Sequence, residues 1–427
     1  FVGSRMFHGV RAHAVLAATG FSPHPERHVM VRPIRLLPGE SVTLPIVMAM
    51  TENLLTSEEL AHQWEVQPDP LTAHRRTYQA WFDENCPTFT CDDPYVEKMY
   101  WYRWYVARQC LSRAKAGALP HPYFFEGTRE SHFPRLIAFS SPHIIAETRW
   151  LRDPQYAFGQ VRNHVLNADE QHHFFISARI DEARGDYNNW ITQAAWRAFW
   201  VHPDEAFLKE VVAALAGDVL GTLRAFDPDD DGLPASRNHW STGMEFQPSF
   251  WYFDGFDNTK PDAKMERGDF AAYLYGNAMA VADAYRYLGL TDEAARFERV
   301  AERTRDACLR KMWDEKDRFF YGIRQDDDAV APVREIVGFY PFMSRIPPNQ
   351  PQYTATLAYL VDEDEFWTAY PPATASKQVP VYSPSISKWP GPGGRTHGCM
   401  WNGPTWPHAT SVILDIAAIA IRQYDQR

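Results

Sequence analysis

Residues 269–313 read DFAAYLYGNAMAVADAYRYLGLTDEAARFERVAERTRDACLRKMW, and their pattern of apolar side chains indicates the class of fold. Phe270, Leu274 and Val281 recur at the spacing of one helix face. Gly289 is a typical residue to end that helix, and a second periodic stretch follows it at once. The segment therefore predicts two antiparallel helices joined by a short turn.

The same period recurs on both sides of this hairpin. Further helices of a helical body are expected over residues 92–116, 134–150, 154–168, 186–201, 204–226, 351–360 and 404–424. Long loops rich in Gly, Pro and aromatic residues separate them, which indicates helical hairpins arranged around a centre. The first of these helices contains YWYRWYVARQCL, which is apolar nearly all round, so we expect it to be buried on every side.

The N-terminal part of the chain has a different pattern. Residues 28–50 hold two β-rich runs around a Leu-Pro-Gly-Glu turn, which predicts a hairpin. Residues 1–55 are therefore expected to be the end of a β-sandwich-like domain that begins upstream of Phe1, although an edge hairpin packed on the helices is the alternative. Residues 56–91 are expected to form a helical linker, with a capping box that starts at Thr56. The helical domain is then 92–427.

The composition and the absence of certain motifs exclude several classes of function. Hydrophobic residues make up 45% of the 427 residues and the net charge is −11, so this is a globular chain without the clustered basic residues that nucleic acids or anionic membranes need. No apolar run is long enough for a membrane span, and no signal peptide is visible. The five cysteines lack metal-site spacing, and no phosphate or dinucleotide motif occurs, so neither a metal nor a cofactor is expected. Neither the compartment nor the oligomeric state follows from the sequence.

Four loops concentrate polar residues among aromatic ones, at 124–134, 227–256, 334–342 and 394–407. Because each adjoins an expected helix, all four could meet at one end of a helical barrel. The second loop begins like a calcium-binding loop at Asp227, but Asn238 stands where that motif needs a Glu. An Asp-rich turn after a helix is the favoured interpretation there.

Glu245 lies among Trp240, Phe250, Trp251 and Tyr252. A carboxyl group in apolar surroundings has a raised pKa, and a protonated carboxyl near neutral pH can serve as a general acid for a glycosidic oxygen. A surface Glu with aromatic residues packed behind it is the alternative. Glu335 follows Arg334, which favours its ionised form, and a structural salt bridge is the alternative to a catalytic role.

Several segments resemble the six-hairpin glycosidases related to glycoside hydrolase family 63 and the trehalases. These segments, in matching order, are RDPQYAFGQV, DYNNWITQAAW, STGMEFQPSFWYFD, REIVGFYPFM and GCMWNGPTWP. The resemblance covers about residues 92–427. It implies a mainly α fold, an (α/α)6 toroid preceded by a β-sandwich and incomplete here at the C-terminus, with a carbohydrate in its central funnel and an inverting mechanism. Relatives in this group include mannosylglycerate hydrolases and α-glucosidases.

The resemblance also suggests roles for single residues. Glu245 matches the general-acid position, where the family usually has Asp. Residues expected to contact or shape the sugar site are Trp101, Arg129, Glu130, Trp240, Trp251, Tyr252, Trp401, Asn402 and Trp406, of which Arg129 and Glu130 follow from loop position only. The general base of the family lies beyond the Trp-Asn-Gly-Pro stretch, so it is expected after Arg427, with Glu335 as the runner-up.

The sequence thus predicts an exo-acting glycoside hydrolase whose partner is a carbohydrate. A glycoside phosphorylase on the same toroid is one alternative, and it would need a phosphate site near the acid. A carbohydrate-binding protein without catalytic activity is the other.

Overall fold

A small antiparallel sheet opens the chain. The computed structural model describes residues 2–7, 10–27, 29–51, 53–113, 118–127, 136–169 and 187–425. Strands β1 (Val2–Phe7), β2 (Val10–Ala17) and β5 (Val47–Thr51) pair in the order β1-β2-β5. Val15 and Ala49 pack against Ala61 of the first helix, α1 (Leu54–Glu65), and so give this sheet a core of its own. Whether it belongs to a larger β-sandwich stays a prediction.

The hairpin predicted over residues 28–50 is not formed. The turn itself exists, since the backbone N–H of Glu40 donates to the Leu37 carbonyl at 3.0 Å. The flanking segments do not pair with each other, because β5 pairs along its whole length with β2 and the short β4 (Met30–Val31) pairs with β3 (Ser22–Pro23).

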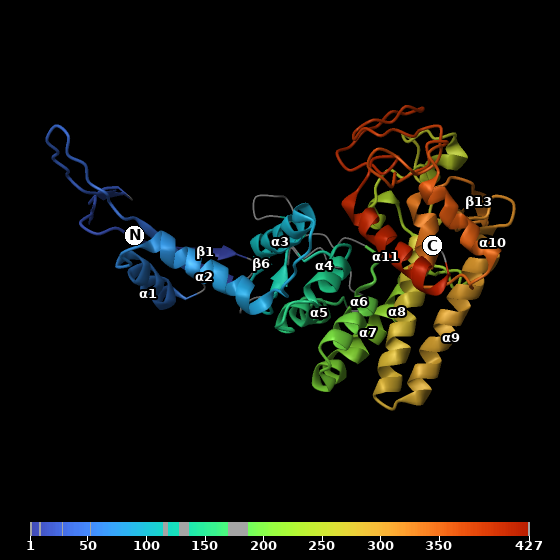
Figure 1. Cartoon of the computed structure of the whole chain (residues 1–427), viewed down its shortest axis with the longest axis horizontal. Coiled ribbons are helices and arrows are strands. Elements are labelled where there is room, and N and C mark those ends of the chain that lie inside the picture. The colour runs from blue at the N-terminus through green and yellow to red at the C-terminus, as the bar shows by residue number, and fades with distance from the viewer. Residues whose placement is uncertain are drawn as a thin grey trace.

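Two helices fill the predicted linker. Helix α1 begins earlier than predicted, because Asn53 and not Thr56 is its N-cap: the Asn53 side chain accepts a hydrogen bond from the Thr56 N–H. Helix α2 (Pro70–Asn85) is capped in the same way by Asp69. Figure 1 shows these two helices at one end of the molecule and the long helices α8 and α9 at the other.

Helix α3 (Pro94–Gln109) corrects a second expectation. Its sequence predicts burial on every side, yet only Trp104 is fully buried, while Tyr95 is 80% and Tyr102 is 55% exposed. One face packs on Trp81 of α2 and on Phe124. The aromatic residues of the other faces contact no second layer within the described part of the chain, and an all-round apolar pattern alone could not reveal this.

The helical body is built from two sets of elements. In chain order its main elements are α4 (Ser141–Thr148), α5 (Gln155–Leu166), α6 (Ile191–Val201), α7 (Glu205–Phe226), α8 (Gly268–Tyr287), α9 (Thr291–Ala307), the 3-10 helix η4 (Ile336–Phe342) and α11 (Pro407–Gln423). Elements α4, α6, α8, η4 and α11 contact one another in series, while α5, α7 and α9 pack outside them. This alternation of inner and outer helices confirms the predicted six-hairpin architecture.

The pair α8–α9 forms as its sequence predicts, and Figure 1 shows the two long helices side by side. Phe270, Leu274 and Val281 are all buried, and Leu274 and Val281 belong to the main core together with Phe297 of α9. Gly289 adopts φ of +77°, which an L-residue rarely takes, and this left-handed residue ends α8. The stripe of apolar residues is thus the inner face of a hairpin.

Short elements fill the loops between the helices. Strands β8 (Ala235–Ser236), β9 (Met265–Glu266), β12 (Gly322–Arg324) and β13 (Ala329–Ala331) form a four-stranded sheet in the order β13-β12-β9-β8. Two-stranded pairs join β6 (Leu111–Ser112) to β7 (Tyr123–Phe124) and β10 (Trp313–Asp314) to β11 (Phe319–Phe320). The remaining helical turns are η1 (His239–Thr242), η2 (Pro248–Asp254), the π-helix η3 (Cys308–Met312), α10 (Pro351–Thr354) and η5 (Ala355–Val361). Among the residues described, none of the helices has the length and apolar character to cross a membrane.

Candidate active site

Three of the four predicted loops meet at one end of the inner helices. The loop before α8 contacts the one before η4, where the Ser249 hydroxyl donates to the Glu335 carboxylate at 2.8 Å. It also contacts the loop before α11, where the Asn258 side chain donates to the Arg395 carbonyl at 2.8 Å. The fourth loop, before α4, is described only in part. Most of the third predicted loop, 334–342, is itself the inner element η4, and the other three loops precede inner elements, which explains why segments so distant in sequence converge.

Glu245 lies on the loop before α8 and is bonded to the loop before α11. Its carbonyl accepts a hydrogen bond from the Trp401 backbone N–H at 2.9 Å, and its carboxyl oxygen Oε2 accepts one from the Cys399 thiol at 2.8 Å. Within the described ranges no other side chain donates to this carboxyl. The side chain is half-buried. Burial raises the pKa of Glu245, while the hydrogen bond from Cys399, a hydrogen bond from the backbone N–H of Glu245 itself and the charge of His397 act in the opposite direction.

Aromatic and charged side chains line a cavity of about 580 Å³ beside this loop. Trp240, which is 46% exposed, lies at the cavity, as do Lys260 and Arg395. The other lining residues include His239, Phe246, Trp251, Asp262 and His397. A cavity with aromatic walls and a few polar groups suits a small polar ligand that has apolar faces.

Glu335 occupies a different environment. Its side chain is 3% exposed, and its carboxylate accepts hydrogen bonds from the backbone N–H and the hydroxyl of Ser249, at 2.7 and 2.8 Å. Burial raises the pKa of Glu335, and the Arg267 charge and both Ser249 bonds oppose that rise. The neighbouring Arg334 pairs with Glu365 instead, at 2.6 Å. This arrangement ties the Glu335 carboxylate to the segment that carries Glu245.

The Trp-Asn-Gly-Pro-x-Trp stretch lies next to Glu245 but turns much of its surface inward. Trp401 is 2% exposed and stacks on Trp406, with 5.3 Å between the ring centroids. Asn402 is fully buried, and its amide donates to the carbonyls of Val381 and Lys388 at 2.8 and 2.9 Å. These contacts hold the preceding loop in place.

The other predicted sugar-contacting residues are spread more widely. Trp251 is 2% exposed and donates to the Lys260 carbonyl at 3.0 Å, while Tyr252 beside it is half-buried. Trp101 packs in a separate apolar cluster with α2 and α5, which places it with a different part of the body. Arg129 and Glu130 lie outside the described residues.

Sequence reasoning gave no role to two groups near Glu245. Glu126 interacts electrostatically with Glu245: burial raises its pKa first, and the Glu245 charge adds to that rise. Its position in the first polar loop was the available signal. Cys399 is the second group, and burial together with the Glu245 charge raises the pKa of its thiol to about 12, so it stays protonated. Nothing in its sequence context pointed to Glu245.

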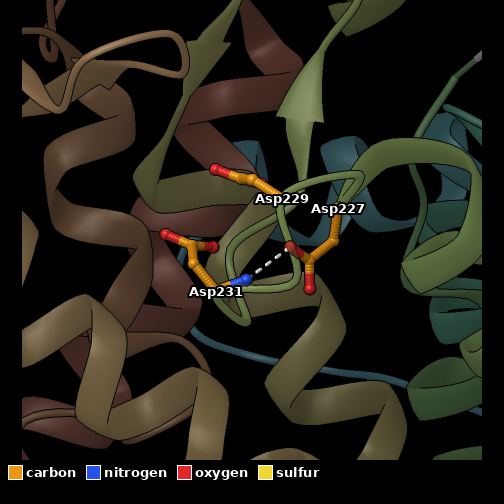
Figure 2. Close-up of side chains that lie close together, drawn as sticks. All are labelled: Asp227, Asp229 and Asp231. Carbon is orange, nitrogen blue, oxygen red and sulfur yellow. Dashed lines mark hydrogen bonds between the residues drawn. The ribbon is translucent and has the colours of Figure 1, made fainter.

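The Asp-rich turn after α7 could also hold a cation. Figure 2 shows Asp227, Asp229 and Asp231 on one tight loop, where the Asp231 backbone N–H donates to Asp227 Oδ1 at 2.9 Å. A second acidic group joins Asp231 to Glu266 and Asp328.

Two basic side chains pair with three of these acids. Arg303 contacts Asp227 at 2.9 Å, and Lys311 contacts both Asp231 and Asp328. Protein cations thus pair with Asp227 and Asp231 of the turn, and the structural interpretation favoured from the sequence stays a prediction.

Comparison with known proteins gives the family. The model of the mannosylglycerate hydrolase MGH1-like glycoside hydrolase domain matches residues 133–420. A protein of Borreliella burgdorferi described only as uncharacterized is 33% identical over 72 residues, 17% of this chain and 15% of that protein.

Solved structures share the fold. A sialidase structure superposes with a TM-score of 0.67 at 23% identity, over 82% of this chain and 30% of that one. The glycoside hydrolase family 63 mannosylglycerate hydrolase of Thermus thermophilus, solved with glucose, superposes with a TM-score of 0.57 at 14% identity, over 75% of this chain and 86% of that one. The chain spans less than a third of the length of the sialidase and of the Borreliella protein.

At these identities the solved structures show a common fold, which agrees with the inner and outer helices described above. The family model covers more than half of the chain and includes Glu245, Cys399 and the Trp-Asn-Gly-Pro stretch. The chain therefore belongs to the mannosylglycerate hydrolase MGH1-like glycoside hydrolase family.

Proposed function

We propose that this protein is an exo-acting, inverting glycoside hydrolase in which Glu245 is the general acid. The observation that carries the proposal is the setting of Glu245, which is half-buried where three loops meet and lies on the loop whose Trp240, Phe246 and Trp251 line a cavity. A general acid must carry a proton near neutral pH, and burial acts in that direction because it raises the pKa of Glu245. The substrate is a carbohydrate with a terminal glycosidic bond.

In the proposed reaction Glu245 transfers its proton to the glycosidic oxygen while the bond from the anomeric carbon to that oxygen breaks. A water molecule attacks the anomeric carbon from the opposite face and gives its proton to a carboxylate base. The product hemiacetal then has the inverted anomeric configuration, and the enzyme returns to its starting state when the base releases its proton to solvent and Glu245 takes one up.

For the general base we keep the prediction made from the family resemblance, which is a carboxylate after Arg427. Glu335, the runner-up, is 3% exposed and accepts two hydrogen bonds from Ser249. Those contacts favour a structural role behind the Glu245 loop over direct activation of a water molecule.

The acid role is tested with Glu245→Gln in the full-length protein. Activity on natural glycosides, whose leaving groups need a proton, should fall about 10²- to 10⁴-fold. Glycosyl fluorides or dinitrophenyl glycosides should lose much less, because their leaving groups depart without a proton. Glu302→Gln, at an exposed position of α9, is the matched control and should leave all rates unchanged. Equal losses for every leaving group, or full activity of Glu245→Gln, would reject Glu245 as the acid.

The sugar is sought with a panel of nitrophenyl glycosides and short oligosaccharides. Mannosylglycerate belongs in that panel, because the Thermus enzyme that shares the fold is a mannosylglycerate hydrolase. Proton NMR during the first turnovers should show the inverted anomer, and oligosaccharides should shorten by one terminal sugar at a time. Retention of configuration would reject the inverting mechanism.

A phosphorylase is a second candidate because Lys260 and Arg395 line the cavity and could hold a phosphate. Cleavage that requires inorganic phosphate and yields a sugar phosphate would establish it. Sugar binding without cleavage under either condition would favour a binding protein.

A further inference from the structure

The strongest unassigned feature is a chain of donors that ends on Glu245. The Trp401 indole Nε1 lies 3.4 Å from the Cys399 sulfur, and that sulfur lies 2.8 Å from Glu245 Oε2. We propose that Cys399, held by Trp401, is the positioning residue that orients the Glu245 carboxyl and fixes which of its oxygens carries the catalytic proton. This inference rests on the proposed role of Glu245 as general acid.

The chemistry of the three side chains decides which atom donates in each of these two hydrogen bonds. An indole N–H can only donate, so the Cys399 sulfur must be the acceptor in its contact with Trp401. The thiol has a single proton, and the carboxyl oxygen at 2.8 Å is the acceptor in its path. Because burial and the nearby Glu245 charge keep the thiol protonated, it acts as a donor over the whole working range of pH.

The donor chain makes the two carboxyl oxygens of Glu245 unequal. Oε2 accepts the thiol hydrogen bond, so the proton of the neutral acid resides on Oε1. On this proposal Oε1 is the oxygen that donates its proton to the glycosidic bond. A general acid works well only when its proton lies on the oxygen that faces the leaving group.

Several contacts fix the position of Trp401, the first donor in this series of hydrogen bonds. Trp401 is 2% exposed and stacks on Trp406, whose indole N–H donates to the Met400 carbonyl at 2.8 Å. The Trp401 backbone N–H also holds the Glu245 carbonyl at 2.9 Å. The segment that carries Cys399 is therefore bound to Glu245 through both main chain and side chain, and the thiol has little freedom to turn away.

The test compares Cys399→Ala with Cys399→Ser in the full-length protein, using the nitrophenyl glycoside that is turned over fastest. Both variants remove the sulfur and almost the same volume, but only Ser keeps a donor. Loss of the donor should lower kcat/KM of the Ala variant about three- to tenfold, the size of one hydrogen bond. The Ser variant should stay close to the wild type.

The pH profile separates positioning from packing. Activity needs protonated Glu245, so kcat/KM falls as pH rises through the Glu245 pKa. The thiol bond lowers that pKa, so its removal in Cys399→Ala should move the alkaline limb to higher pH, while Cys399→Ser should leave it in place. Trp401→Phe keeps the stacked ring but removes the indole N–H. It should shift the alkaline limb of the pH profile when Cys399 is present, and should have no such effect in a protein that already carries Cys399→Ala.

A spectroscopic measurement needs no substrate. The difference in infrared spectrum between wild type and Cys399→Ser isolates the S–H stretch of Cys399, which lies at low frequency when the thiol donates to a carboxylate. Glu245→Ala should move this band to the frequency of a free thiol.

The outcomes discriminate between the two proposals. If Glu245→Gln is inactive but both Cys399 variants behave like the wild type, the positioning role is rejected and the acid assignment stands. The positioning role is also rejected if Cys399→Ala and Cys399→Ser have the same kcat/KM and pH profile, or if the S–H band keeps its frequency in Glu245→Ala. A fully active Glu245→Gln rejects both.

Discussion

Arg267 and Asp269 form a buried ion pair at the start of α8, with 3.1 Å between Arg267 Nε and Asp269 Oδ1 and exposed fractions of 1% and 0%. The Arg267 guanidinium also donates to the Gln247 side chain and lies over the Phe250 ring, 5.2 Å from its centroid. The pair therefore joins an inner helix to the loop that carries the candidate acid.

Arg267→Met should lower the free energy of unfolding by about 3–5 kcal/mol, because it leaves the Asp269 charge buried without its partner. Urea titration measures this loss. Arg296→Met is the control, since the Arg296–Glu293 pair is about half exposed on both sides and should contribute at most about 1 kcal/mol. Similar losses in the two variants would contradict a special role for the buried pair.

Glu266→Gln should stabilise the protein increasingly as pH rises. Glu266 is fully buried, and its carboxyl oxygens have no hydrogen-bond partner among the described residues. Burial, reinforced by the Asp231 charge, raises the pKa of Glu266 to about 9.

Between the ordinary pKa of 4.5 and about 9, the folded protein keeps this proton while the unfolded chain releases it, so raising the pH through this window lowers stability. A neutral Gln escapes this loss, and its Tm advantage should grow across that window. The same pH series on Glu302→Gln, an exposed site on α9, should show no trend. A constant or shrinking advantage for Glu266→Gln would contradict the buried neutral carboxyl.

Gly243→Ala should damage the candidate site. Gly243 has φ of +67°, and a Cβ there would lie 2.7 Å from the Phe139 ring. The left-handed backbone costs the variant about 1–2 kcal/mol, and the new Cβ must also displace either Phe139 or the loop that continues to Glu245. Activity should fall more than stability, as measured by kcat and Tm on the same preparation.

Gly255→Ala provides a matched control for this change. Gly255 has a similar φ of +62°, but nothing lies within 4 Å of the position its Cβ would take. It should show the backbone cost alone, with kcat retained. Equal loss of kcat in both variants would show that the contact with Phe139 has no bearing on the site.

Ser249→Ala should destabilise the protein by about 1–3 kcal/mol, because one oxygen of the buried Glu335 carboxylate loses its hydroxyl donor. The Ser249 bonds lower the pKa of Glu335, so the variant should also be relatively more stable at low pH, where Glu335 is neutral. Thermal unfolding at several pH values measures both effects, with exposed Ser385→Ala as the control. A loss that does not depend on pH would indicate packing alone.

The regular part of the fold could be predicted from the sequence because its signals are local. The apolar spacing of α7 and of the α8–α9 hairpin, with Gly289 between α8 and α9, determines those helices within a few residues. The burial of α3 could not be predicted in this way. A helix that is apolar all round indicates only that its faces can be buried, and the position of neighbouring elements decides whether they are.

The candidate site was predictable in outline but not in its contacts. The aromatic setting drew attention to Glu245, and three of the polar loops that were expected to meet do meet. The roles inside them depend on long-range contacts: Trp401 and Asn402 face inward as supports, and Cys399 reaches Glu245 across 154 residues of sequence. No local pattern encodes such a pairing.

That sequence separation has a consequence for biosynthesis. Ribosomes add about 5–20 residues per second, so roughly 8–30 s separate the emergence of Glu245 from that of Cys399. During this interval the nascent chain has its candidate acid but lacks the thiol and the tryptophan that hold the carboxyl. The hydrogen bond from Cys399 to the candidate acid can therefore form only after this interval, and chains released before Cys399 is added lack it.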